Sequence, residues 1–226
     1  MASAPYGSVS LLCTQAALQR PRIPTLLSAF LTLLNDRLSE SIFLPLLPFL
    51  LEDFSSNGST VGLLSGTYAL SQFAVAPLIG ALSDRFGRKP IISLCVFGSV
   101  IGMGLFATTL TVPWQPIWPE AAAAGLPLAL LFLARVIDGA SGGTAATATA
   151  VLADITTPEN RAKAFGLIGV AFGLGFVLGP GLGGLLGDVN RILPAWAATA
   201  FAVANLIVVL GLLPETHPIN ARKHLP

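Results

Sequence analysis

The chain has 226 residues, of which 54% are hydrophobic and only 10% are charged. A soluble domain carries roughly 25% charged residues, so this sequence cannot supply a water-facing surface. Twelve basic and eleven acidic residues give a net charge of +1, which argues against nucleic acid as a partner. Cys13 and Cys95 are isolated thiols, so we expect no disulfide framework, no metal and no cofactor. These observations predict an all-α integral membrane protein whose surface faces the lipid bilayer.

Long apolar runs along the sequence mark the candidate membrane spans. A bilayer core of about 30 Å needs about 20 helical residues per crossing. The sequence predicts six transmembrane helices packed as one antiparallel bundle, at about 25–51, 62–82, 91–111, 126–152, 164–187 and 195–213. Residues 1–24 lack a basic signal-peptide start and are predicted to be a cytoplasmic N-terminal leader, and residues 214–226 a cytoplasmic tail.

Five ionisable residues lie inside the first and fourth apolar runs: Asp36, Arg37, Glu40, Arg135 and Asp138. Each costs about 2.5–3.5 kcal/mol at the middle of a bilayer. The i,i+3 spacing lets Arg37 neutralise Glu40 and Arg135 neutralise Asp138, which leaves Asp36 as the surplus carboxylate. One interpretation is that these residues form two ion pairs whose role is to hold the bundle together. We favour the other, a water-filled cavity in which Asp36, or else Glu40, carries a proton, because charges inside membranes usually mark a pathway.

The segment 80–90, which joins the second predicted helix to the third, combines glycines with charges. Gly87 permits a tight turn. Asp84 is an acid among three bases and can bridge to Arg88 or to a neighbouring helix end. A loop that only set the orientation of the chain in the membrane would need the basic residues alone. The added glycines and the acid Asp84 therefore indicate a further role for this loop.

The fifth predicted helix carries glycine at every fourth position, at Gly175, Gly179, Gly183 and Gly187. These glycines form a groove without side chains, which lets another helix approach closely. Packing inside the six-helix unit would explain scattered glycines, but we expect a groove of this length to receive a partner helix from outside the unit. Pro180 removes one backbone hydrogen bond and is predicted to bend the helix.

Basic residues predict the orientation, because they concentrate on the cytoplasmic side of membrane proteins. On the opposite side the sequence places only Arg191. Both termini are therefore predicted to be cytoplasmic. The nine basic residues on that side are Arg20, Arg22, Arg85, Arg88, Lys89, Arg161, Lys163, Arg222 and Lys223.

Several ordered signatures resemble the major facilitator superfamily, in particular its tetracycline-efflux and drug:proton antiporter branch. The loop matches the signature after the second helix at Gly80, Leu82, Asp84, Arg85, Gly87, Arg88, Lys89 and Pro90. The fifth helix matches the antiporter signature at Gly166, Gly175, Gly179, Pro180, Gly183 and Gly184. The fourth helix resembles the arginine signature at Arg135 and Gly139, with Asp138 where glutamine is common. Five further positions or segments resemble the same branch: Asp36, residues 45–48, Gln72, residues 153–161 and residues 213–217.

The resemblance implies the N-terminal six-helix half of a two-half fold, with the substrate bound near the midplane between the halves. The partner would be a second six-helix half, whether fused, split or missing. The resemblance, taken together with the buried charges, implies four sets of roles. Asp36, Glu40, Arg135 and Asp138 would serve proton coupling, and Asp36, Arg37, Gln72 and Arg135 would line the substrate cavity. Gly80, Asp84, Arg85, Gly87 and Arg88 would close the cytoplasmic side in the outward-open state, and the glycine helix would pack on the other half.

The expected function is therefore proton-coupled export of a small amphiphilic or drug-like molecule by alternating access, in a bacterial inner (plasma) membrane. Two departures from the tetracycline exporters argue against tetracycline itself. Arg37 and Glu40 replace small residues in the first helix, and Gly102 stands where those exporters use an acid for the metal-chelated drug.

Two alternatives remain at this point. The first is a non-transporting remnant or accessory membrane subunit. The second is a rhomboid-like intramembrane serine protease, because residues 139–142 match the G-x-S-G pattern around Ser141. Such an enzyme needs a histidine base in the sixth helix, whereas His217 and His224 follow that helix. We therefore assign no catalytic residue and do not expect an enzyme.

Overall fold

The computed structural model describes residues 23–42, 44–52, 54, 58–120 and 125–216. Most of the predicted leader and the end of the predicted tail lie outside these residues. The described chain contains helices and turns but no strand, so the predicted all-α class is confirmed. The elements are α2 (Ile23–Ser41), the 3-10 turn η1 (Leu44–Leu46), α3 (Leu47–Leu50), α4 (Gly58–Phe86), α5 (Arg88–Thr111), α6 (Trp114–Ile117), α8 (Leu126–Ala140), α9 (Thr144–Ile155), α10 (Arg161–Val189) and α11 (Leu193–Leu212).

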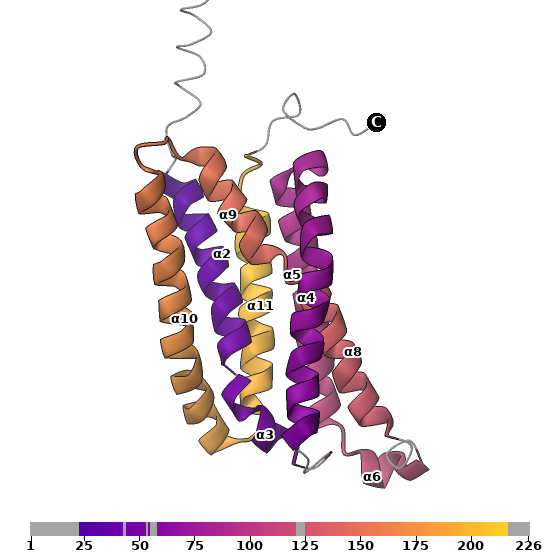
Figure 1. Cartoon of the computed structure of the whole chain (residues 1–226). Helices are drawn as coiled ribbons and strands as arrows, with labels where there is room; N and C mark the ends of the chain where they lie inside the picture. The colour runs from indigo at the N-terminus through magenta and orange to yellow at the C-terminus, as the bar shows by residue number, and fades with distance from the viewer. Residues whose placement is uncertain (1–22, 43, 53, 55–57, 121–124, 217–226) are drawn as a thin grey trace, which may run out of the picture.

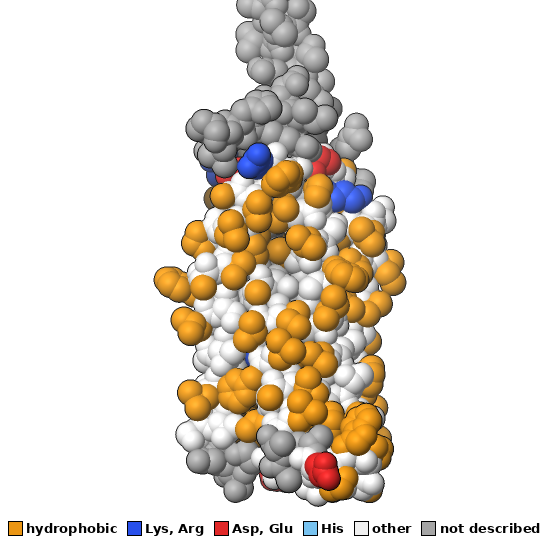
Figure 2. Space-filling model, turned by 90° about the vertical axis from the view of Figure 1, so that its right-hand side faces the viewer, with side chains coloured by type: hydrophobic (Ala, Val, Ile, Leu, Met, Phe, Trp, Pro, Cys, Tyr) orange, Lys and Arg blue, Asp and Glu red, His pale blue; other side chains and the backbone are white. Residues whose placement is uncertain are grey.

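Most of these helices have the length and composition of membrane spans. Among the described residues, five segments qualify: α4, α5, α8 with α9, α10 and α11. The remaining long helix, α2, has 19 residues and carries three charged side chains, so its composition is less apolar. Figure 2 shows hydrophobic side chains over the height of the bundle, with charged ones near its ends. The chain is thus an integral membrane protein.

The long helices pack as a row that curves around a common interior. α2 contacts α10 and α11, α11 contacts α5, α5 contacts α8, and α8 contacts α4. α10 and α4 end this series of contacts, and Figure 1 shows α11 between α2 and α4. α9 crosses in front of the upper part of α11 in this view and contacts α2, α4, α5 and α10.

Two of the predicted helices are interrupted. The first, expected at 25–51, ends as α2 at Ser41 and continues as η1 and α3, where Pro45 and Pro48 lack the backbone N–H of a regular helix. The fourth, expected at 126–152, is divided into α8 and α9 by a turn at 141–143. The neighbouring helix α4 approaches the glycines of this turn so closely that a Cβ at Gly142 would meet the amide nitrogen of Gln72 and lie 3.0 Å from its Cγ and Cδ. The Gln72 amide donates a hydrogen bond of 3.0 Å to the Gly142 carbonyl, which the break leaves available.

Candidate functional site: a buried charge cluster

The charged residues of α2 form one three-membered ion group. The Arg37 guanidinium lies 2.6 Å from the Asp36 carboxylate and also pairs with Glu40. The pairing of Arg37 with Glu40 confirms the i,i+3 prediction. The prediction that Asp36 is the surplus, unpaired carboxylate is wrong, because the long arginine side chain folds back onto its chain neighbour. One guanidinium therefore serves two carboxylates on this helix.

A second ion pair lies on α8, deeper in the bundle. Arg135 and Asp138 form the ion pair that their i,i+3 spacing predicted, at a distance of 3.3 Å. The two residues are 2% and 3% exposed. The Arg135 guanidinium lies 4.9 Å from the ring centre of Phe106 and 5.5 Å from that of Tyr68, so it is held between two aromatic side chains. This arrangement partly replaces the hydration that the guanidinium loses on burial.

A small polar cavity connects the two ion groups. Its volume of about 20 Å³ is enough for one water molecule. The residues that line it include Asp36, Arg37, Glu40, Tyr68, Asp138 and Asn205. Arg135 and Gln72, which were expected to line the substrate cavity, do not border this one: Arg135 is buried behind it and Gln72 faces the α8–α9 turn. Three carboxylates and the guanidinium of Arg37 therefore line the cavity, and the guanidinium of Arg135 pairs with Asp138 behind it.

Some residues of this site were missed by the sequence analysis. Tyr68 on α4 contacts Arg135, and Asn205 on α11 is 2% exposed with no hydrogen-bond partner for its Oδ1 among the described residues. Both are polar residues within long apolar runs, which is the signal that would have found them, because such residues usually face the interior of a bundle. Phe172 on α10 lies with its ring centre 4.9 Å from the Arg37 guanidinium carbon. An aromatic residue in an apolar helix gives no such signal.

The glycine groove of α10 is occupied from within the chain. A Cβ at Gly175 would lie 2.6 Å from the Arg37 Cβ, and one at Gly179 would lie 2.8 Å from the Ser41 Cβ. The Ser41 hydroxyl also lies 2.8 Å from the Gly175 carbonyl oxygen. At Gly183 the nearest atoms belong to the backbone of Ile42, and the Leu46 Cδ1 lies 3.4 Å from a Cβ built there. The prediction that this groove receives a helix of another bundle is therefore wrong.

The remaining glycines of the antiporter signature are not part of that contact. A Cβ at Gly166 or Gly184 would meet no atom within 4 Å in the described structure. The helix also continues through Pro180 without interruption from Arg161 to Val189. The signature thus contains two kinds of position: those that hold α2 against α10 and those that the described residues leave uncovered.

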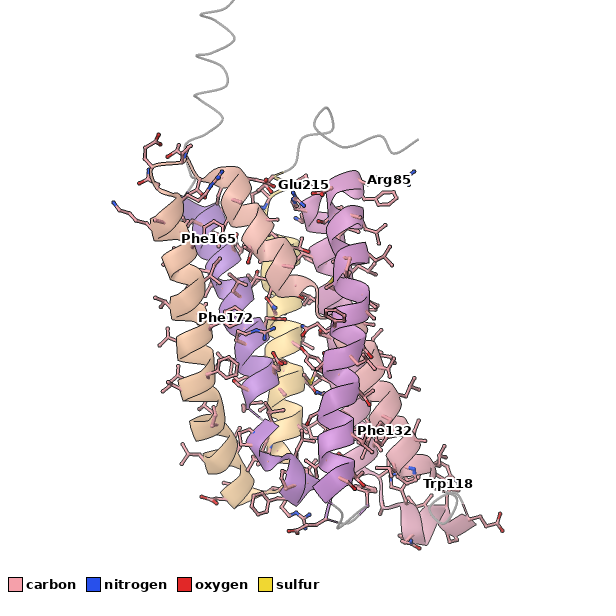
Figure 3. The ribbon with its side chains drawn as sticks, in the orientation of Figure 1. Arg85, Trp118, Phe132, Phe165, Phe172 and Glu215 are labelled. Carbon is pink, nitrogen blue, oxygen red and sulfur yellow. The ribbon has the colours of Figure 1, made fainter. Side chains whose placement is uncertain are left out.

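A charge network lies at the upper end of the bundle, around the loop between α4 and α5. Gly87 alone forms the connection, with a φ of 107° that favours glycine. The Arg88 guanidinium lies 2.7 Å from Asp84 and 3.0 Å from Asp154 at the end of α9. The Arg88 backbone N–H donates to the Glu215 carboxylate, 2.9 Å away, after the end of α11. Figure 3 marks Glu215 and Arg85 at this end.

Only part of the predicted gating loop forms one cluster in the structure, and residues outside the loop, Asp154 and Glu215, belong to the same cluster. Asp84 and Arg88 come together, whereas Arg85 is exposed and stacks on Phe86 at 5.3 Å, and a Cβ at Gly80 would meet no described atom within 4 Å. The segments that hold Asp154 and Glu215 resemble the tetracycline-efflux branch, but their sequence alone did not predict a contact with Arg88.

The serine of the protease alternative has a packing role. A Cβ at Gly98 on α5 would lie 2.9 Å from the Ser141 Cβ, so Ser141 points at this helix. His217 and His224, which that alternative would need as a base, lie outside the described residues.

A helical membrane bundle with ion pairs in its interior is typical of membrane transporters. A sequence profile of the Major Facilitator Superfamily matches residues 27–224, and the chain belongs to this superfamily. The class C tetracycline resistance protein of Escherichia coli is 39% identical over 198 residues, which cover 86% of this chain and 46% of that protein. Major facilitator superfamily domain-containing protein 10 of Homo sapiens is 32% identical, over 90% of this chain and 47% of that protein.

The fold agrees with this assignment. The crystal structure of the human organic anion transporter MFSD10 (TETRAN) superimposes with a TM-score of 0.72 at 31% identity, over 90% of this chain and 50% of that one. The predicted resemblance to the tetracycline-efflux branch is confirmed by the relatives named above. The chain spans about half the length of the curated relatives it matches.

Proposed function

We propose that this chain is the N-terminal half of a proton-coupled exporter. The observation that carries the proposal is the charge balance at the cavity: Asp36, Glu40 and Asp138 line a space for one water molecule and pair with two guanidiniums, that of Arg37 at the cavity and that of Arg135 behind it. An uncompensated charge is costly in such surroundings. Binding of one proton removes the excess negative charge, and its release restores it, so the site is suited to proton coupling.

The second half would pack on the side of the bundle that carries α4 and α10. Both helices expose large apolar side chains, among them Phe73, which is 80% exposed, and Val177, which is 74% exposed. Six further helices placed there would complete the two-half architecture, with the substrate at the interface of the halves. Alternating access belongs to the pair of halves, in which the Arg88 network would hold the cytoplasmic end closed in the outward-open state.

The orientation follows from the distribution of charge. Arg85, Arg88 and Lys89 lie at the end of the bundle that also holds the start of α10, and Arg191 lies at the other end. We place the Arg88 end, and with it both termini, in the cytoplasm, in the inner membrane of a bacterium.

The substrate is proposed to be a small amphiphilic molecule other than tetracycline. A Cβ at Gly102 would lie 2.7 Å from the Asp138 Cβ, so this position has no room for an acid. The names of the relatives point to different substrates, since one group is named for tetracycline resistance and MFSD10 for organic anion transport.

The test is transport by the chain joined to the C-terminal half of the class C relative, in liposomes with an imposed pH gradient. Ethidium, fluorescein and tetracycline serve as cationic, anionic and reference probes. We expect gradient-driven efflux of ethidium or fluorescein, and loss of its proton dependence by at least tenfold in Asp36→Asn and Glu40→Gln. Glu52→Gln, which changes an exposed carboxylate away from the cavity, is the matched control.

Two outcomes would contradict the proposal. Efflux with the same proton dependence in all variants would remove the α2 carboxylates from the coupling. No efflux of any probe under either direction of the gradient would favour the non-transporting remnant.

A further inference from the structure

Arg37 has two kinds of partner, and only one of them is acidic. On its own helix the guanidinium pairs with Asp36 and Glu40. From α10 it is contacted by the ring of Phe172, with its central carbon 4.9 Å from the ring centre. Arg37 as a whole is buried, so its guanidinium has lost most of its hydration. A cation over an aromatic face in such surroundings is attracted by the ring quadrupole.

The backbone of α10 holds this contact in place. Gly175, one turn after Phe172, leaves room only for the Cβ and backbone of Arg37. The Ser41 hydroxyl, one turn after Arg37, lies 2.8 Å from the Gly175 carbonyl oxygen. The two helices therefore meet without a flexible side chain between them, and the Phe172 ring has a defined position relative to the start of the Arg37 side chain.

We infer that Phe172 is a positioning residue that keeps the Arg37 guanidinium between Asp36 and Glu40, and that it thereby sets the pH at which the cavity takes up a proton. The inference rests on the proposed proton coupling. A guanidinium held close to a carboxylate favours its charged form. When the ring is removed, the guanidinium gains alternative positions, its pairing with the two acids weakens, and the proton is bound at a higher pH.

The other groups around these acids stay the same in this comparison. On α4 the neighbouring group is Tyr68, on α8 they are Asp138 and Arg135, and on α11 it is Asn205. From α10 the contact to Arg37 is made by the uncharged Phe172. Replacement of Phe172 therefore changes the restraint on Arg37 without adding or removing a charge.

The experiment is an infrared titration of the full 226-residue chain reconstituted in lipid bilayers, in which the carboxylic acid C=O band reports protonation. In Phe172→Leu we expect the midpoint of this band to move to higher pH by about half a unit or more. Phe172→Tyr and Phe172→Trp keep an aromatic face and should retain the wild-type midpoint. Phe176→Leu is the matched control, because Phe176 lies one turn further along α10 and contacts Phe172 at a ring distance of 6.5 Å.

The outcomes separate this inference from the proposed function. A wild-type band that does not titrate between pH 4 and pH 10 would overturn proton uptake in the cavity, and this inference with it. A band that titrates but has the same midpoint in Phe172→Leu would overturn the inference alone, as would an equal shift in Phe172→Tyr. If Phe172→Leu does not fold, Arg37→Lys is the second variant: it keeps the charge but loses the planar group, and an unchanged midpoint in it would also overturn the inference.

Discussion

The chain contains two arginine-centred charge networks, and they differ chiefly in their access to water. At the end of the bundle where α4 meets α5, Arg88 pairs with Asp84, whose side chain is 41% exposed, and with Asp154. In the interior, Arg135 pairs with Asp138, whose side chain is 4% exposed. Water and ions can balance an excess charge in the first network but not in the second. Under the proposed function, the first network would suit a contact that opens and closes, whereas the interior one would suit a site whose excess negative charge is neutralised by a bound proton.

The largest effect in this comparison is expected from removal of the deepest cation. Arg135→Met leaves Asp138 buried without its partner and should destabilise the protein by about 3–5 kcal/mol. Arg135→Met combined with Asp138→Leu removes both charges and should recover much of the loss. The measurement is the free energy of unfolding in mixed micelles, with Arg85→Met as the exposed control. A double variant as unstable as the single one would show that lost packing, and not the unpaired charge, is the cause.

A smaller effect is expected where α10 meets α2. Gly179→Val would push a side chain into Ser41 and should cost about 1–3 kcal/mol through overpacking. Gly181→Val is the control, because a Cβ there meets no described atom within 4 Å. The same unfolding measurement applies. Equal stability of the two variants would contradict the assignment of this groove to α2.

The smallest effect is expected at the water-exposed network. Asp154→Asn removes one partner of Arg88 and should change the free energy of unfolding by about 1 kcal/mol or less. Because salt screens exposed charges, the difference from the wild type should shrink further between 0.05 M and 1 M NaCl. A loss that is large and independent of salt would mean that this network is as enclosed as the interior one.

The sequence predicted the interactions that follow from spacing along one helix. The i,i+3 pairs of Arg37 with Glu40 and of Arg135 with Asp138 are of this kind. The contact between Asp36 and Arg37 was missed because neighbouring side chains of a helix point in different directions, and only a long, flexible side chain brings them together.

Contacts between helices were harder to predict. The glycine spacing of α10 identified a groove, but a groove does not specify its occupant, which proved to be α2 of the same chain. Asp154 and Glu215 are 66 and 127 residues away from Arg88, and their contact depends on the packing of whole helices. The turn between α8 and α9 was indicated by two adjacent glycines, but the apolar run around them hid it.

The contact between α2 and α10 has a mechanical consequence. Where helices touch through long side chains, a change of rotamer can absorb a displacement of one against the other. At Gly175, Gly179 and Gly183 the nearest atoms are backbone and Cβ atoms or a short hydroxyl side chain, and the Leu46 side chain lies farther away, 3.4 Å from a Cβ at Gly183. Such a contact cannot be compressed, and one helix can slide along the other only if the two first move apart. We therefore expect α2 and α10 to move as one rigid unit, so that a tilt of α10 also displaces Asp36 and Glu40 on α2.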